Sequence, residues 1–197
     1  MVTESSGTHN DTRNPGSPCL DGKVKQGTIL PGTFTYGSDA REVEFPGAAT
    51  TEWQLGSVQE VAWVGLAWHK GGYTYRLCKL GEEGRLGLTE DCFQKNILEF
   101  ATDYTMVRKE GSWHLGNWER YEQKDVRVGT HPEGSVWRPA GIFEEGQSYI
   151  RKDEVLVPED LEEGDYVLSW RWDIATKEGQ VWLSCANVRL ENSKIGK

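Results

Sequence analysis

The stretch GDYVLSWRWD at residues 164–173 decides the fold class, because two kinds of side chain alternate along it. One face would carry Tyr166, Leu168, Trp170 and Trp172, and the other Val167, Ser169, Arg171 and Asp173. A period of two is typical of a β-strand. A second β-prone run, QVWLSCANVRL at residues 180–190, follows after a short connection, so the two runs predict a hairpin.

The segment upstream adds further strands. Residues 61–69 are apolar on both faces, which predicts a central strand covered on both sides. Gly71 and Gly72 predict a turn or bulge, and YTYRLC at residues 73–78 alternates as a half-buried strand does. Residues 89–96 predict a single helical turn that begins at Thr89. About seven short strands separated by turns favour an all-β, antiparallel β-sandwich with long loops.

The 197 residues suit one large all-β domain. Residues 1–50 are rich in Gly, Pro, Ser and Thr and predict an extended arm with one strand. The sandwich core is expected over residues 51–191, and residues 192–197 form a tail. Nine Trp and 23 Gly beside only two Met also favour strands and turns over packed helices.

Charge and hydropathy exclude two classes of partner. The net charge of -9 argues against nucleic acid, whose binding needs basic side chains. No apolar run approaches the roughly 18 residues of a membrane span. Residues 1–14 are polar and contain no signal peptide, so either the true start lies upstream or the chain is cytosolic.

Sequence motifs of common enzymes are missing. The chain has no G-x-S-x-G elbow, no H-E-x-x-H, no P-loop and no G-x-G-x-x-G after a strand. Paired carboxylates stay open, because 31 acidic residues offer too many pairs to rank. Among the four histidines, a structural role is the expectation for His114 and His131.

His69 differs because of the sequence around it. The segment HKGGYTYRLC at residues 69–78, the GDYVLSWRWD strand and the QVWLSCA run at residues 180–186 together resemble the lytic polysaccharide monooxygenases of algae and other microbial eukaryotes. The resemblance covers about two fifths of the chain. It implies an immunoglobulin-like or fibronectin-like sandwich that holds one copper ion on a flat face, and oxidative cleavage of chitin, cellulose or a related polysaccharide.

The resemblance also implies roles for single residues. His69 corresponds to the second copper-binding histidine, and three nitrogens in a T shape suit Cu(II). Gln180 corresponds to the residue that orients the oxygen species, and Trp182 takes the axial position, where relatives carry an aromatic side chain. Exposed tryptophans could stack on sugar rings, although core packing is the commoner role of any one of them; the candidates are Trp68, Trp113, Trp118 and Trp137.

The family's first copper ligand is an N-terminal histidine, whereas this sequence begins with Met1. The expectation is that this ligand lies upstream of Met1 or has been lost, so that the chain as written lacks it. The resemblance implies an extracellular protein. Two alternatives stay open: a non-catalytic carbohydrate-binding or cell-surface module of the same fold, and a cytosolic structural domain with reduced cysteines.

The four cysteines are scattered and include no C-x-x-C pair, so two disulfides in an oxidising compartment are the simplest interpretation. Cys78 with Cys92 would be the natural local bridge, leaving Cys19 with Cys185. The other two connectivities stay open. A second departure from the family is Ile174, where longer relatives often carry a cysteine.

Overall fold

The structure is a computed structural model that describes residues 6–8, 28–30, 34–35, 50–65, 70–109, 117–141, 149–174 and 180–192. Its strands, in chain order, are β1 (Ser6–Thr8), β2 (Thr28–Leu30), β3 (Phe34–Thr35), β4 (Thr51–Gln54), β5 (Val58–Gly65), β6 (Gly71–Lys79), β7 (Tyr104–Lys109), β8 (Glu119–Glu122), β9 (Arg138–Pro139), β10 (Tyr149–Leu156), β11 (Gly164–Ile174) and β12 (Gln180–Glu191). A 3₁₀ turn (Arg85–Gly87) and the helix α1 (Glu90–Lys95) connect β6 to β7.

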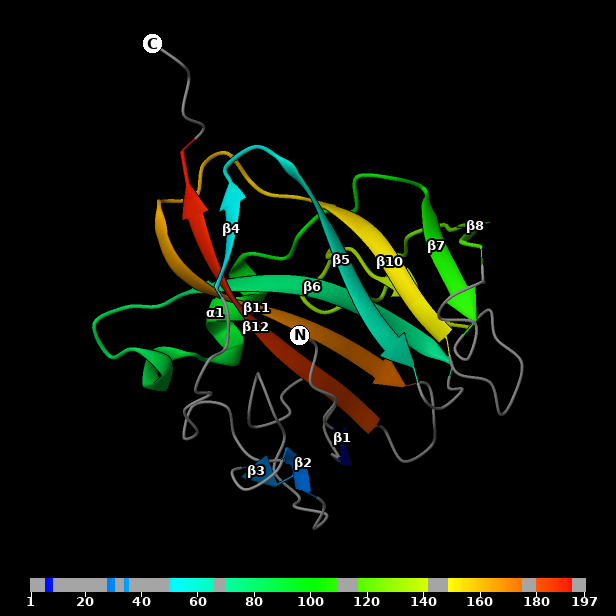
Figure 1. The fold of residues 1–197 in the computed structure, drawn as a ribbon, viewed down its shortest axis with the longest axis horizontal. Coiled ribbons are helices and arrows are strands. Elements are labelled where there is room, and N and C mark those ends of the chain that lie inside the picture. Colours follow the sequence, from blue (N-terminus) through cyan, green and yellow to red (C-terminus); the bar gives the residue numbers. More distant parts are fainter. Residues whose placement is uncertain are drawn as a thin grey trace.

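The described strands form two main sheets that pack face to face (Figure 1). One sheet has the order β1-β12-β11-β6-β9, with β4 added beside β12, and the other has the order β5-β10-β7-β8. All pairings in these sheets are antiparallel except that of β4 with β12. The predicted all-β antiparallel sandwich is therefore confirmed, with more strands than the seven expected.

Aromatic side chains fill the space between the two sheets. Trp170 and Trp172, from the same face of β11, meet Trp63 of β5, with ring centroids 4.6 and 5.4 Å from that of Trp63. Tyr73 and Tyr75 extend this layer along β6. Rings of this size bury a large apolar area, which is the main favourable term in folding. The alternation at residues 166–172 thus places its aromatic face in the core.

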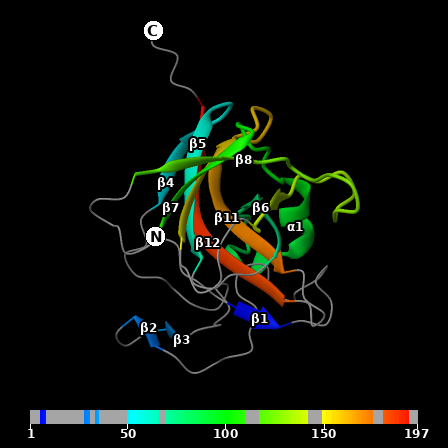
Figure 2. The same ribbon diagram turned by 90° about the vertical axis from the view of Figure 1, so that its right-hand side faces the viewer.

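Strand β6 is buried on both faces, so the expected half-buried strand is wrong. Its polar positions Thr74 and Arg76 are as buried as its tyrosines. The reason is that α1 covers the outer side of β6 and β11, away from the four-stranded sheet (Figure 2). The predicted helical turn is confirmed: the Thr89 hydroxyl accepts a hydrogen bond from the Cys92 amide at 3.2 Å and caps α1.

Two other strand predictions are wrong. Strand β5 is an edge strand of the four-stranded sheet and not a central one. Val61 and Trp63 face the core, whereas Ala62 and Val58 are exposed, because nothing described covers the outer face there. Gly71 does not make a turn but begins β6, where its positive φ of 118° favours a residue without a Cβ atom.

The arm also differs from expectation, since three short strands occur within residues 1–50 where one was expected. Strand β1 pairs with the start of β12 and so joins the main sheet, while β2 and β3 pair only with each other. In the part of the chain that the structure describes, no helix has the length and apolar character needed to cross a bilayer.

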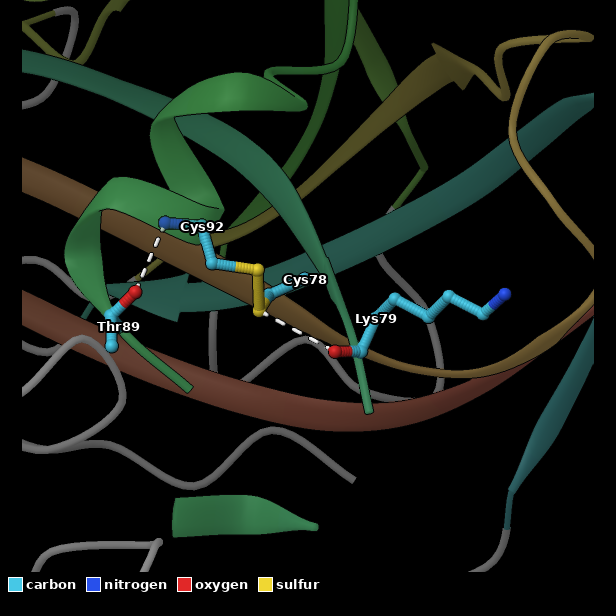
Figure 3. The surroundings of a disulfide bond; sticks show 4 residues. All are labelled: Cys78, Lys79, Thr89 and Cys92. Atoms are coloured by element: carbon cyan, nitrogen blue, oxygen red, sulfur yellow. Dashed lines mark hydrogen bonds between the residues drawn. A yellow bond between two sulfur atoms is a disulfide. The ribbon is translucent and has the colours of Figure 1, made fainter. Parts of the chain in front are cut away.

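A disulfide joins Cys78 at the end of β6 to Cys92 in α1, as predicted (Figure 3). The bond holds α1 against the sheet, where Phe93 packs on Val167 and Leu88. Cys185 is also disulfide-bonded. Cys19 lies outside the described residues, so its predicted bond to Cys185 stays a prediction.

Replacing both Cys78 and Cys92 by alanine is expected to lower the free energy of unfolding by about 2–4 kcal/mol, because a cross-link closing a short loop restricts the unfolded chain. Urea unfolding followed by tryptophan fluorescence measures the change. Leu86→Ala is the control, since Leu86 lies in the same connection and is 71% exposed. A double variant as stable as the control would show that the bridge does not stabilise the fold.

Candidate functional site

Three strand ends lie side by side at one end of the six-stranded sheet. Strand β6 begins at Gly71, β11 ends at Ile174, and β12 begins at Gln180. The register pairs Ile174 with Gly71 on one side and with Gln180 on the other. Two strand spacings separate Gly71 from Gln180, a distance of roughly 10 Å.

This register concerns the two residues that the sequence singled out for copper chemistry. His69 precedes Gly71 by two positions but lies outside the described residues, and Gln180 is described only as part of the β12 backbone. The structure thus places the backbone of Gln180 beside the end of β11, which in turn lies beside the start of β6. The roles of both side chains stay predictions.

Trp182 lies two residues after Gln180 in β12 and is half-buried. It pairs with Trp172 of β11 and with Ser6 of β1, and its ring centroid is 6.2 Å from that of Trp172. The indole therefore leans on the aromatic core of the sandwich. The Trp172–Trp182 contact thus places two aromatic rings at the end of the sheet where β12 begins.

The predicted sugar-stacking tryptophans have different outcomes. Trp68 and Trp113 lie outside the described residues. Trp118 is half-buried, and the Arg108 guanidinium and the Lys152 ammonium each lie 4.8 Å from its ring centroid. Two cations thus already occupy positions near this ring. Trp137 is 9% exposed and lies beside β9.

Sequence reasoning missed a buried charged cluster on the outer side of β6 and β11. Glu90 of α1 accepts hydrogen bonds from Arg76 at 2.5 Å and from Arg171 at 2.7 Å. Arg171 also holds Asp173 through two bonds of 2.6 and 2.9 Å. Polar positions in strands rich in aromatic residues were the available signal, but Arg171 lies 81 residues from its partner Glu90 in α1.

Burial and neighbouring charges shift the pKa values of this cluster. Burial lowers the pKa of Arg76 to about 10 despite the nearby Glu90 carboxylate. Burial alone would raise the pKa of Glu90, but Arg76 and Arg171 outweigh it and hold the pKa below its usual value. Burial raises the pKa of Asp173, with Arg171 opposing the shift. Glu90 and the two arginines are therefore charged and paired at neutral pH.

A second polar cluster lies between the sheets around Asp153 of β10. Its carboxylate accepts hydrogen bonds from Tyr73 at 3.0 Å, from Tyr75 at 3.1 Å and from Arg138 at 3.2 Å. The Thr105 hydroxyl donates to the same carboxylate. Burial raises the pKa of both tyrosines. This cluster joins β6, β7, β9 and β10, and its role is structural.

Metal ligands are the remaining question for the sheet end. Among the residues that the structure describes, no three His, Cys, Asp or Glu side chains are grouped so as to hold a metal ion. The chemistry of the predicted donor set is compatible with this finding, since a copper site made of imidazole and amine nitrogens would draw only on residues outside the described ranges.

No protein-family model and no curated protein matches the chain. Solved structures do. A lytic polysaccharide monooxygenase of class AA15 from Thermobia domestica, in its Cu(I) state, has a TM-score of 0.50 at 14% identity, and the match covers 88% of this chain and 76% of that one. A CBM33 protein from Bacillus amyloliquefaciens in complex with Cu(I) has a TM-score of 0.43 at 12% identity, over 80% of this chain and 64% of that one.

A cellulose-active polysaccharide monooxygenase from M. thermophila has a TM-score of 0.36 at 16% identity, over 74% of this chain and 55% of that one. At 14% identity, the match to the AA15 structure shows a similar fold and nothing about function. It agrees with the resemblance that the His69 and Gln180 segments carry. The chain thus folds as a lytic polysaccharide monooxygenase does.

Proposed function

We propose that this chain is a polysaccharide-active domain that binds one copper ion and cleaves glycosidic chains oxidatively. The observation that carries the proposal is the strand register, which aligns Gly71, Ile174 and Gln180 at one end of the sheet. His69 directly precedes this edge in the chain. The likeness of the fold to the AA15 structure supports the same assignment.

In this proposal, His69 supplies one imidazole ligand, and an N-terminal histidine of the mature protein supplies its amine and its ring. Copper held in this way would activate dioxygen or peroxide in the presence of a reductant. Gln180 would orient the oxidant by hydrogen bonding without coordinating the metal. Trp182 would form an aromatic wall of the site, and its contact with Trp172 would keep it in place.

The proposed substrate is a neutral polysaccharide such as chitin or cellulose. The net charge of -9 repels anionic polymers and leaves neutral ones unaffected. A disulfide between Cys78 and Cys92 fits an oxidising compartment, so we propose that the protein acts outside the cell.

His69→Ala in the naturally processed protein is expected to abolish the copper-dependent release of oxidised oligosaccharides, because it removes one of the proposed nitrogen ligands. Mass spectrometry of products from chitin and cellulose, with ascorbate as reductant, measures the release. Leu86→Ala is the control, since Leu86 is 71% exposed and belongs to the 3₁₀ turn after β6.

Equal product release by both variants would overturn the copper assignment. Binding to insoluble polysaccharide that survives both His69→Ala and chelation, without any oxidised product, would instead show a non-catalytic carbohydrate-binding module.

A further inference from the structure

A cavity of about 580 Å³ opens at the edge of the six-stranded sheet, next to the strand ends described above. Its walls come from the start of β6, the end of β11, β9 and the connection before β9. The volume falls within the range of ligand pockets, roughly 300–1,000 Å³. The cavity belongs neither to the Asp153 cluster nor to the aromatic core.

One wall is aromatic and rigid. Trp137 lines the cavity, and its indole N–H donates a hydrogen bond to the Ser135 hydroxyl at 3.0 Å. Its backbone exchanges two hydrogen bonds with Val126, which lines the same wall. On the β6 side, Gly71 and Gly72 offer backbone only, and a Cβ atom on Gly72 would lie 3.6 Å from the Trp137 side chain. The glycines therefore keep the space beside Trp137 open.

The polar wall of the cavity comes from β11. Asp173 and Arg171 both line the cavity and form the two-bond pair described above. A carboxylate has about four acceptor positions, so Asp173 can accept further hydrogen bonds while it holds Arg171. Arg171 is 3% exposed and is also tied to Glu90, so its charge is already compensated.

This combination suits a sugar ring better than an anion. The C–H groups of a pyranose pack on an apolar wall, here the exposed part of Trp137 together with Val126, and its hydroxyls donate to a fixed carboxylate. An anionic ligand would meet Asp173, the exposed Glu133 at the rim and a net charge of -9, with no uncompensated guanidinium to receive it. The polar groups are few and convergent, as in small-molecule sites.

We propose that this cavity is a subsite that takes one pyranose residue of a neutral glycan, with Trp137 and Val126 as its apolar wall and Asp173 as the acceptor of its hydroxyl groups. The inference rests on the proposed function, since it extends the glycan surface from the end of the sheet into the cavity beside β6. A glycan bound there gains a contact that a flat face alone does not provide.

The test uses two valines of one connection. Val126 lines the cavity and is 44% exposed, whereas Val128 is 86% exposed and does not line it. Val126→Trp is expected to fill the cavity and weaken binding of cellohexaose or N-acetylchitohexaose at least tenfold, whereas Val128→Trp leaves binding unchanged. Isothermal titration calorimetry measures both, and the two hexamers show which neutral glycan is preferred.

Trp137→Phe provides a second test, because it keeps a ring but removes part of the apolar wall of the cavity, and a several-fold loss of affinity is expected. Binding by Val126→Trp equal to that of wild type would overturn the proposal. So would wild-type protein that binds neither hexamer, or that binds oligogalacturonate more tightly than both.

Failure of the subsite and failure of the proposed function are distinguishable. The copper-dependent signal in electron paramagnetic resonance is expected to be the same in Val126→Trp and wild type, because Val126 is not one of the proposed copper ligands. Loss of glycan binding with an intact copper signal confirms the subsite. An absent copper signal in wild type contradicts the proposed function while leaving the titrations to decide the subsite.

Discussion

Replacing Asp153 by alanine is expected to lower the free energy of unfolding by about 3–5 kcal/mol. The carboxylate is fully buried and accepts hydrogen bonds from Tyr73, Tyr75 and Arg138. Its removal leaves Tyr75 and part of the Arg138 guanidinium without this acceptor in a place that water does not reach, and leaves Tyr73 with the Thr105 hydroxyl as its partner. Each unsatisfied buried group costs about 1–3 kcal/mol. Equilibrium unfolding in guanidinium chloride measures the loss.

The matched control for this change is Glu60→Ala. Glu60 pairs with Lys152, the neighbour of Asp153 in sequence, but its side chain is 59% exposed, so a change below about 1 kcal/mol is expected. Asp153→Asn keeps one acceptor and should lie between wild type and Asp153→Ala. A loss below about 1 kcal/mol for Asp153→Ala would contradict the assignment of this cluster as the polar link between the sheets.

Glu90→Ala is expected to have an effect of similar size, about 3–5 kcal/mol, because it leaves two guanidiniums without their shared carboxylate. The side chains of Arg76 and Arg171 are only 2% and 3% exposed, and both donate to Glu90. The same glutamate holds α1 on the sheet. Glu162→Ala is the control, since Glu162 is 81% exposed and pairs only with Lys79 among the described residues. Thermal unfolding measures both variants.

Glu90 also makes the stability of the protein depend on pH in the acid range. The two arginines hold the pKa of Glu90 below its usual value, although burial opposes them. Its contribution to stability is therefore complete above the unfolded pKa, about 4.3, and is lost as the pH falls through the lower folded value. Burial raises the pKa of Asp173, which acts in the opposite direction but is present in both proteins.

The stability difference between wild type and Glu90→Ala should therefore be constant from about pH 7 to about pH 5 and shrink below about pH 4. Urea unfolding at several pH values measures the difference. If it were unchanged at pH 3, the salt bridge would not be the source of the stabilisation.

The fold could be predicted wherever local alternation decides it. Residues 164–173 and 180–190 alternate, and both lie in long strands of one sheet. The place of β5 at a sheet edge could not be predicted, because its partner β10 lies far along the chain. The burial of Arg76 could not be predicted because α1 covers it, and only the tertiary structure shows which face of the sheet a short helix covers.

The candidate site was predicted from motifs and not from periodicity. The segments of His69 and Gln180 carry the resemblance, and the register brings Gly71, two positions after His69, to the same edge as Gln180, while the roles of His69 and Gln180 stay predictions. The cavity beside Trp137 was not predictable, because it needs β6, β9 and β11 at once. A cysteine spacing of 14 residues, in contrast, was local enough to suggest the Cys78–Cys92 bond.

The measurement that tests the account most directly is the identity of the N-terminus of the naturally produced protein, by intact mass and N-terminal peptide mapping. The proposed copper site needs a histidine there, because its amine and its ring supply two of the three nitrogens. The account predicts a mature chain that begins with histidine. A mature chain that begins at Met1 or Val2 would contradict it.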